Sequence, residues 1–257
     1  MDLDLQDRVY VVTGGSRGLG LATARALVAD GARVVLAARD PESLDRAAAS
    51  LSPDRVTTVP ADLADPEVPA LLVERARAAY GRLDGALVSV GGPAPGSFMG
   101  ASDSEWTAAF HSVLLGAVRT TRTVAAALLE EEHGQGGSIA AVLSTSVKAP
   151  VANLAISNGL RPGLAMALKT LADEVGPRGV RVNGLLPGRI ATDRLRELDE
   201  ATGDAAAARQ AHEASIPLRR YGEPDEFGRV AAFVLSPAAS YLTGVMVPVD
   251  GGLTRAL

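Results

Sequence analysis

The chain contains no cysteine, which excludes disulfide bonds and thiolate metal sites, and we expect no metal centre. The formal net charge is −5 and the basic residues are scattered, which argues against a nucleic-acid partner. No apolar run approaches the roughly 18 residues that cross a bilayer. Residues 1–7 are acidic and lack the apolar core of a signal peptide. We therefore expect a cytoplasmic protein with no membrane partner.

Apolar residues, by contrast, are abundant, at 47% of 257 residues. They form continuous runs of Val, Leu, Ile and Ala, which are typical of strands buried on both faces. Because these runs alternate with helical stretches, the sequence predicts a parallel sheet with helical crossovers. We expect one doubly wound α/β domain over residues 1–257. The predicted strands are 8–13, 33–37, 55–59, 84–90, 138–144, 180–186 and 245–249, and the predicted helices are 18–29, 42–51, 66–80, 102–132 and 152–175.

The stretch 189–216 breaks this alternation. It is rich in Ala and Arg and follows the sixth predicted strand. It would lie over the carboxyl ends of the strands, where open α/β sheets bind their ligands. We predict a substrate lid there that is loosely ordered without ligand and closes over it.

A glycine-rich segment, 13–20, joins the first predicted strand to the first predicted helix. Its glycines permit a tight turn and a close approach of the backbone to a pyrophosphate, and the helix amino terminus supplies N–H groups. No Lys-Ser/Thr pair follows, so it is not the phosphate loop of an NTPase. The segment predicts a dinucleotide site. Its candidate residues are Gly14, Ser16, Arg17, Gly18, Leu19 and Gly20.

This segment resembles the cofactor loop of the short-chain dehydrogenase/reductase family. The segments 62–63, 181–192, 241–244 and 249–252 resemble further parts of that family, in order, so the resemblance covers essentially the whole chain. It implies a Rossmann-type fold with seven parallel strands and a nicotinamide cofactor. The further cofactor contacts that it implies are Asp62, Leu63, Gly91, Arg161, Pro187, Gly188, Ile190 and Thr192.

The end of the second strand indicates which nicotinamide cofactor is used. An acidic residue at Ala38 would accept a hydrogen bond from the ribose 2′-hydroxyl and favour NAD, but it is missing. Arg39 follows at once, and Arg17 lies in the glycine segment. Two guanidinium groups suit a 2′-phosphate, so we expect NADP(H) in preference to NAD(H), although Asp40 weakens this preference slightly.

At the positions of the family's catalytic residues, this sequence departs from the family pattern. The family uses a Ser, a Tyr, a Lys four residues later, and an Asn; the corresponding positions here are Ser144, Ser157, Arg161 and Val113. None of the four tyrosines is followed by a lysine at that spacing. The segments 147–150, 157–161 and 252–255 resemble an atypical, β-ketoacyl-acyl-carrier-protein-reductase-like subgroup.

These replacements change the proton chemistry. Arg161 keeps a cation one helical turn from Ser157 and can hold ribose hydroxyls. Ser157 is shorter than a tyrosine and a far weaker acid. Lys148, four residues after Ser144, is the candidate replacement acid, because a lysine desolvated in the cleft would have a lowered pKa. The candidate catalytic residues are therefore Ser144, Lys148, Ser157 and Arg161.

Three functions fit these observations. The first is an NADP(H)-dependent carbonyl or alcohol oxidoreductase with a non-standard proton donor. The second is a non-catalytic NADP-binding sensor or partner subunit. The third is a lyase similar to halohydrin dehalogenases, which keep the tyrosine and lose the nucleotide loop, the opposite of this pattern. We expect a small carbonyl or alcohol substrate, and the family suggests a homo-oligomer, a dimer or a tetramer. The residues expected in a partly apolar pocket are Pro93, Pro95, Phe98, Met99, Leu195 and Leu198.

Overall fold

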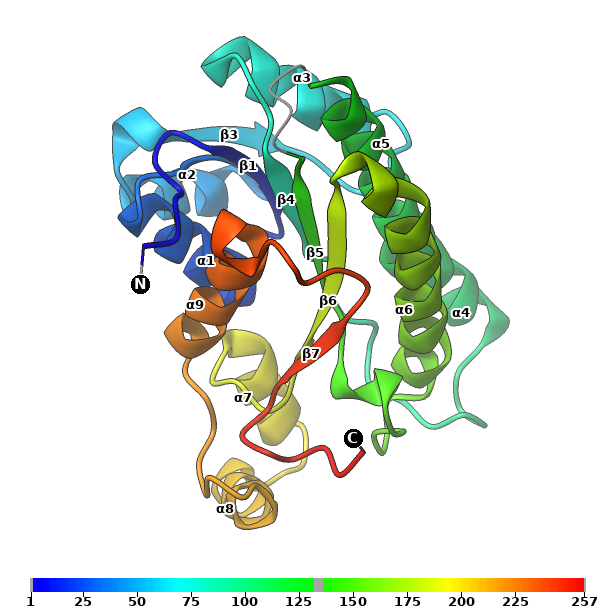
Figure 1. Ribbon diagram of the computed structural model, residues 1–257. Coiled ribbons are helices and arrows are strands. Elements are labelled where there is room, and N and C mark those ends of the chain that lie inside the picture. Colours follow the sequence, from blue (N-terminus) through cyan, green and yellow to red (C-terminus); the bar gives the residue numbers. More distant parts are fainter. Residues whose placement is uncertain (1, 132–135, 257) are drawn as a thin grey trace.

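The computed structural model describes residues 2–131 and 136–256 (Figure 1). Within them, seven parallel strands form one sheet in the order β3-β2-β1-β4-β5-β6-β7. The predicted doubly wound α/β domain is confirmed. The strands are β1 (Val9–Thr13), β2 (Arg33–Ala38), β3 (Val56–Pro60), β4 (Gly85–Val88), β5 (Ser138–Val142), β6 (Arg181–Pro187) and β7 (Met246–Val249).

Helices cover both faces of the sheet, and this burial explains why the strands are continuously apolar. All residues of β1, β4 and β5 are buried. One apolar core lies between the sheet and α1, α2 and α9, and a second lies between the sheet and α3, α5 and α6 (Figure 1). These helices are α1 (Gly18–Ala29), α2 (Pro41–Ala49), α3 (Val68–Tyr80), α5 (Gly116–Glu130), α6 (Ala155–Val175) and α9 (Pro224–Leu235).

The long helix predicted over 102–132 is divided. It consists of α4 (Asp103–Ala109), a π-helical segment η2 (Phe110–Leu115) and α5, and its predicted last residue lies outside the described residues. A π-helical insertion in an α-helix is frequent at functional sites. Gly116 follows it, and a Cβ there would lie 2.6 Å from the Leu63 carbonyl oxygen. The helix therefore passes close to the loop after β3.

The helical stretch Asp103–Glu130 is long and apolar enough to cross a membrane by length and composition. Half of its most apolar window is buried inside the domain, however, and a core helix has the same composition. Its α5 part packs on α3 and α6. Membrane crossing is therefore not needed to explain this stretch.

Helix α9 was not predicted from the sequence, although its start carries recognisable signals. Pro224 is at its first turn, and Glu223 and Glu226 form a capping box. The helix packs along α1, where Gly228 lies against the Ala22 carbonyl. The omission is thus an error of pattern reading, since Gly228 interrupts an otherwise amphipathic stretch.

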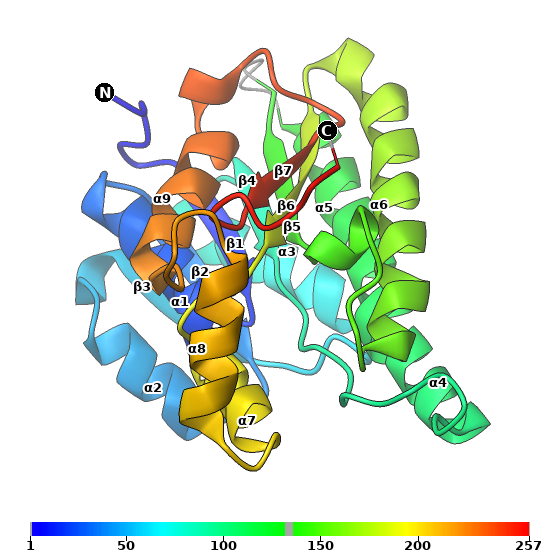
Figure 2. The same cartoon turned by 90° about the horizontal axis from the view of Figure 1, so that it is seen from below.

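The remaining helices, α7 (Asp193–Glu200) and α8 (Ala205–Ser215), follow β6 and lie beyond the carboxyl ends of the strands (Figures 1 and 2). They occupy most of the predicted lid, 189–216. Strand order reverses between β1 and β4, which places the topological switch point at the same edge of the sheet. The helices are formed in this structure, and their closure over a ligand stays a prediction.

Candidate active site

The glycine-rich segment forms a cradle between β1 and α1. Gly14 and Gly18 have φ values of +60° and +55°, in the left-handed region that favours glycine. A Cβ at Gly15 would lie 2.9 Å from Leu36 Cδ2, and one at Gly20 would collide with the Gly14 carbonyl. Arg17, the N-cap of α1, makes no side-chain capping hydrogen bond. The first N–H groups of α1 therefore face the cradle without a side-chain cap, as binding of an anionic diphosphate requires.

The two arginines expected at a 2′-phosphate are both exposed. Arg17 Nη1 lies 4.0 Å from Glu197 Oε1 on α7, a weak contact between largely exposed side chains. Asp40, by contrast, caps α2 by accepting a hydrogen bond from Ser43 N at 3.1 Å, and its hydrogen bonds to Ser43 lower its pKa. The Asp40 carboxylate therefore caps its own helix, although it lies next to Arg39 in the sequence.

Asp62 lies just beyond the end of β3, where the adenine contact was expected. Its side chain is exposed, and its Oδ1 accepts a hydrogen bond from Ala64 N at 3.0 Å. Leu63 is half-buried and packs on the apolar core. On the neighbouring strand ends, Thr13 Oγ1 donates to Ser89 O at 2.9 Å and accepts from Ser89 N at 2.8 Å. This pair fixes the end of β1 against the segment that leaves β4.

A cavity of about 190 Å³ lies at the carboxyl ends of the strands. It brings together residues predicted for the cofactor with residues predicted for the chemistry. The predicted site residues that line it are Leu19, Ser144, Ser157, Arg161, Pro187, Gly188, Ile190 and Thr192. The other lining residues are Gly92, Pro93, Leu143, Leu154, Arg194, Leu195 and Leu198.

Arg161 is the most unusual of these residues, because its side chain is only 4% exposed. Its Nη1 donates to Val142 O at 2.6 Å and its Nη2 donates to Gly91 O at 3.4 Å, while Nε has no hydrogen-bond partner. Within residues 2–131 and 136–256, no carboxylate pairs with it. Burial lowers the pKa of the guanidinium to about 10, so it stays charged at neutral pH.

The two serines lie beside this cation. Ser144 caps a 3-10 turn, η3 (Thr145–Val147), where its Oγ accepts a hydrogen bond from Ser146 N at 3.1 Å. Ser157 is buried in the first turn of α6, one helical turn before Arg161. Both serines line the cavity, so either hydroxyl can contact a ligand there.

Lys148 is placed differently from the other predicted catalytic residues. It directly follows η3, is exposed, and is absent from the cavity lining. The buried position in the cleft that was expected for this lysine is therefore not found in this structure.

Two further residues near the cavity, Val113 and Asn158, have structural contacts. Val113, at the expected asparagine position, is buried in η2 and packs with Ile156 and Leu160. Asn158 accepts from Val151 N at 3.0 Å and donates to Val151 O at 2.8 Å. It therefore fixes the loop between η3 and α6 and shapes the cavity rather than facing a ligand.

The apolar lining is partly as expected. Pro93, Leu195 and Leu198 line the cavity, whereas Pro95, Phe98 and Met99 do not. Phe98 and Met99 are 73% and 92% exposed, so their assignment to the pocket was wrong. The β4–α4 loop turns these side chains outward, a feature that no local pattern in the sequence revealed.

Arg194 was missed by sequence reasoning. It extends from α7, and its Nη2 donates to Pro93 O at 2.8 Å in the β4–α4 loop. This hydrogen bond joins the predicted lid to the opposite rim of the cavity. Only the folded arrangement of 193–200 against 91–96 reveals it, since the two partners are 101 residues apart in the sequence.

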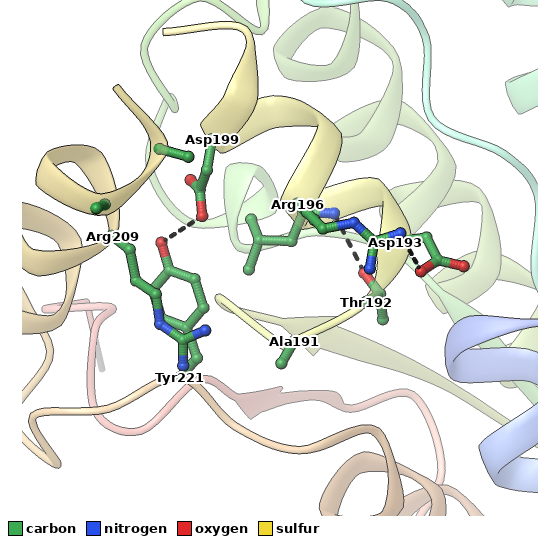
Figure 3. Close-up of a pocket in the computed structure, with 10 residues that line it drawn as sticks. Ala191, Thr192, Asp193, Arg196, Asp199, Arg209 and Tyr221 are labelled. Carbon is green, nitrogen blue, oxygen red and sulfur yellow. Dashed lines mark hydrogen bonds and ion pairs between the residues drawn. The ribbon is translucent and has the colours of Figure 1, made fainter. Parts of the chain in front are cut away.

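A second cavity, of about 340 Å³, opens between α7, α8 and the end of β6 (Figure 3). The buried Tyr221 hydroxyl donates to Asp199 Oδ2 at 3.0 Å, and His212 Nδ1 lies 3.1 Å from the same hydroxyl. Arg189 Nη2 lies 2.6 Å from His212 Nε2, which must accept because arginine only donates. This network ties both lid helices to Arg189, just after β6, and the two cavities share Thr192 and Leu195.

Among the residues that the structure describes, no group of three or more His, Asp or Glu side chains is placed to hold a metal ion. The polar side chains that line the smaller cavity, of about 190 Å³, carry hydroxyl and guanidinium groups. Such groups recognise anions and neutral oxygen atoms rather than cations.

Comparison with known proteins identifies the family. The family model described as enoyl-(acyl carrier protein) reductase matches residues 14–254. An uncharacterized oxidoreductase of Mycobacterium tuberculosis is 39% identical over 97% of this chain and 93% of its own length. Dehydrogenase/reductase SDR family member 4 of Sus scrofa is 33% identical over 98% of this chain and 89% of its own. L-sorbose reductase from Gluconobacter frateurii, solved with NADPH and L-sorbose, has a TM-score of 0.93 at 31% identity and full coverage of both chains.

The chain therefore belongs to the short-chain dehydrogenase/reductase family and is an oxidoreductase.

Proposed function

We propose that the protein interconverts a small carbonyl compound and its alcohol with NADP(H), using a proton donor other than tyrosine. One observation carries this proposal. Leu19 of the glycine cradle and the hydroxyl-bearing Ser144 and Ser157 line the same cavity. A nucleotide held by the cradle would thus reach the residues that can position a substrate oxygen.

The residues of this chain fit a nicotinamide dinucleotide. A Cβ at Gly15 or Gly20 would collide with Leu36 or with the Gly14 carbonyl, so glycine at these positions allows the tight turn that brings the backbone close to a diphosphate. When bound, the cofactor supplies or accepts a hydride. Pro187, Gly188, Ile190 and Thr192 would border its nicotinamide end, since they line the same cavity as Ser144.

The preference for NADP(H) rests on two exposed arginines. Arg39 makes no hydrogen bond or ion pair with another described residue, and Arg17 makes only a weak contact with Glu197. Both guanidinium groups are available to a 2′-phosphate, and no carboxylate replaces Ala38 to hold a 2′-hydroxyl. The NADPH bound by L-sorbose reductase supports the same assignment.

The proton donor is proposed to be a water molecule held by Ser144 and Ser157. Ser144 keeps the family position and would bind the substrate oxygen. Lys148 was the alternative donor, but it is exposed and outside the cavity lining. A water bound between two hydroxyls can deliver a proton to the same point, and general acid catalysis contributes about 10²–10⁴-fold.

The proposed function is tested by measuring NADPH binding and then turnover over a panel of carbonyl compounds and alcohols. Gly14→Ala should weaken NADPH binding at least tenfold, because Gly14 has φ +60° and its Cβ would lie 2.8 Å from Ser89 O. Gly81→Ala is the matched control: Gly81 has φ +76°, but nothing lies within 4 Å of its Cβ position. Tight NADPH binding without turnover of any compound would contradict the proposal.

A further inference from the structure

Arg161 and Arg181 each donate to more than one backbone carbonyl, but the two guanidinium groups differ in how many hydrogen-bond partners they have. Arg181 donates to four carbonyl oxygens, those of Val234, Leu235, Ser236 and Leu242, at 2.8–3.4 Å. Three of these carbonyls lie at the carboxyl end of α9, where the helix dipole is negative. Arg161 donates to only two carbonyl oxygens, and its buried Nε has no partner.

Arg161 is therefore a buried cation whose charge the described protein compensates only through two dipoles. A buried charge is costly unless an opposite charge and hydrogen bonds accompany it. Unlike Arg181, Arg161 lines a cavity, so a ligand can supply the missing opposite charge.

The lining of this cavity suits an anion. Its polar side chains are those of Ser144, Ser157, Thr192, Arg161 and Arg194, which are hydroxyls and guanidinium groups. No Asp or Glu is among the lining residues that the structure describes. The rest of the lining is apolar, and the volume of about 190 Å³ is below the usual 300–1,000 Å³ of ligand pockets, which fits a small substrate.

We propose that the substrate carries a carboxylate and that Arg161 pairs with it, which makes the protein an oxidoreductase of small oxo or hydroxy acids. This inference rests on the proposed function and specifies its substrate class. The carboxylate would lie beside Ser157, where the short side chain leaves space next to the guanidinium. Arg194 adds a second positive charge at the rim, 2.8 Å from Pro93 O. An apolar chain of a few carbons would contact Leu195 and Leu198.

The cofactor phosphates offer a competing explanation for these cations, and a binding experiment separates the two. Pentanoate and pentanamide have nearly the same shape and differ in charge. We expect NADPH-saturated protein to bind pentanoate at least about tenfold more tightly than pentanamide in calorimetry, because a charge-assisted pair is stronger than a neutral one. Equal binding of the two probes, or pentanoate that only displaces NADPH, would overturn the inference.

Variants assign the preference to Arg161. Arg161→Gln should remove the preference for pentanoate, and Arg161→Lys should keep part of it, since the charge remains. Arg178→Gln is the matched control, because Arg178 also donates to a carbonyl, Leu129 O, but is exposed and is not among the residues that line the cavity. If Arg161→Gln does not fold, Arg194→Gln at the rim should still weaken pentanoate binding selectively. An unchanged preference in the folded variants would overturn the assignment.

Turnover provides a second measurement. We expect kcat/KM for 4-oxopentanoate to exceed that for its methyl ester at least tenfold, and the excess to disappear in Arg161→Gln. If the protein does not bind NADPH at all, the proposed function fails. In that case, the preference of the cofactor-free protein for pentanoate over pentanamide still tests whether the anion site exists.

Discussion

At the scale of single residues, Arg39 is the position that most directly sets the cofactor preference. Losing one charge-assisted contact to a phosphate costs about 1.5–3 kcal/mol, roughly ten- to a hundredfold in affinity. We expect Arg39→Ala to weaken NADPH binding by this factor and to leave NADH binding nearly unchanged, as measured by calorimetry. Arg46→Ala is the control, because Arg46 is an exposed arginine of α2 that pairs with Asp40 and Glu42. NADH bound as tightly as NADPH by the unmodified protein would contradict the preference.

The proton donor is decided by two further substitutions. Because Lys148 is exposed and outside the cavity lining, we expect Lys148→Met to keep near-normal turnover. Ser144→Ala should lower kcat by about 10²-fold, since the water and the substrate oxygen lose their common partner. Lys169→Met controls for loss of a lysine, because Lys169 is half-exposed and pairs with Asp173. A hundredfold loss in Lys148→Met with unchanged NADPH affinity would instead make Lys148 the donor.

The candidate site residues that the sequence provided come from the family resemblance. Ser144, Ser157 and Arg161 were assigned by matching the segment of α6 to the family pattern and counting back along the chain. The roles of Arg194 and Asn158 depend on contacts with Pro93 and Val151, which no local pattern specifies. Their side chains hold loops in place, so their roles are evident only from the folded structure.

At the scale of elements, the lid helices depend on the protonation state of His212. Its Nε2 accepts from Arg189, and its Nδ1 faces Tyr221 and Asp199, so the neutral form fits the network. Burial, together with the Arg189 charge, lowers the pKa of His212. Stability from the neutral form is therefore present above the usual pKa of about 6.5 and is lost as pH falls through the lowered pKa.

We accordingly expect the amide protons of 205–215 to exchange faster at pH 5 than at pH 7.5, after correction for intrinsic rates. Replacing the histidine by His212→Asn should flatten this pH dependence. His111→Asn is the control, because His111 is exposed on η2. Equal corrected protection at both pH values would show that the network does not hold the lid. Added NADPH should raise protection over 194–212, and full protection without it would contradict a moving lid.

At the scale of the whole molecule, the sequence predicted the sheet because its strands are buried on both faces. The continuous apolar runs of β1, β4 and β5 are typical of strands that are buried on both faces, and few other structures fit them. Helix α9 was missed for a physical reason. Gly228 lies where this helix passes close to the backbone of α1, and a glycine that allows such an approach looks in the sequence like an interruption of the helix.

This close approach makes a prediction about the stability of the whole domain. A Cβ at Gly228 would collide with the Ala22 carbonyl, where α9 packs along α1. We expect Gly228→Ala to lower the free energy of unfolding by about 1–3 kcal/mol, because overpacking outweighs the gain in helix propensity. Gly163→Ala on α6 is the matched control: nothing lies within 4 Å of its Cβ position, so it should raise the free energy of unfolding by about 0.5–1 kcal/mol. Urea denaturation measures both changes, and a stabilised Gly228→Ala variant would show that α1 and α9 can separate without loss.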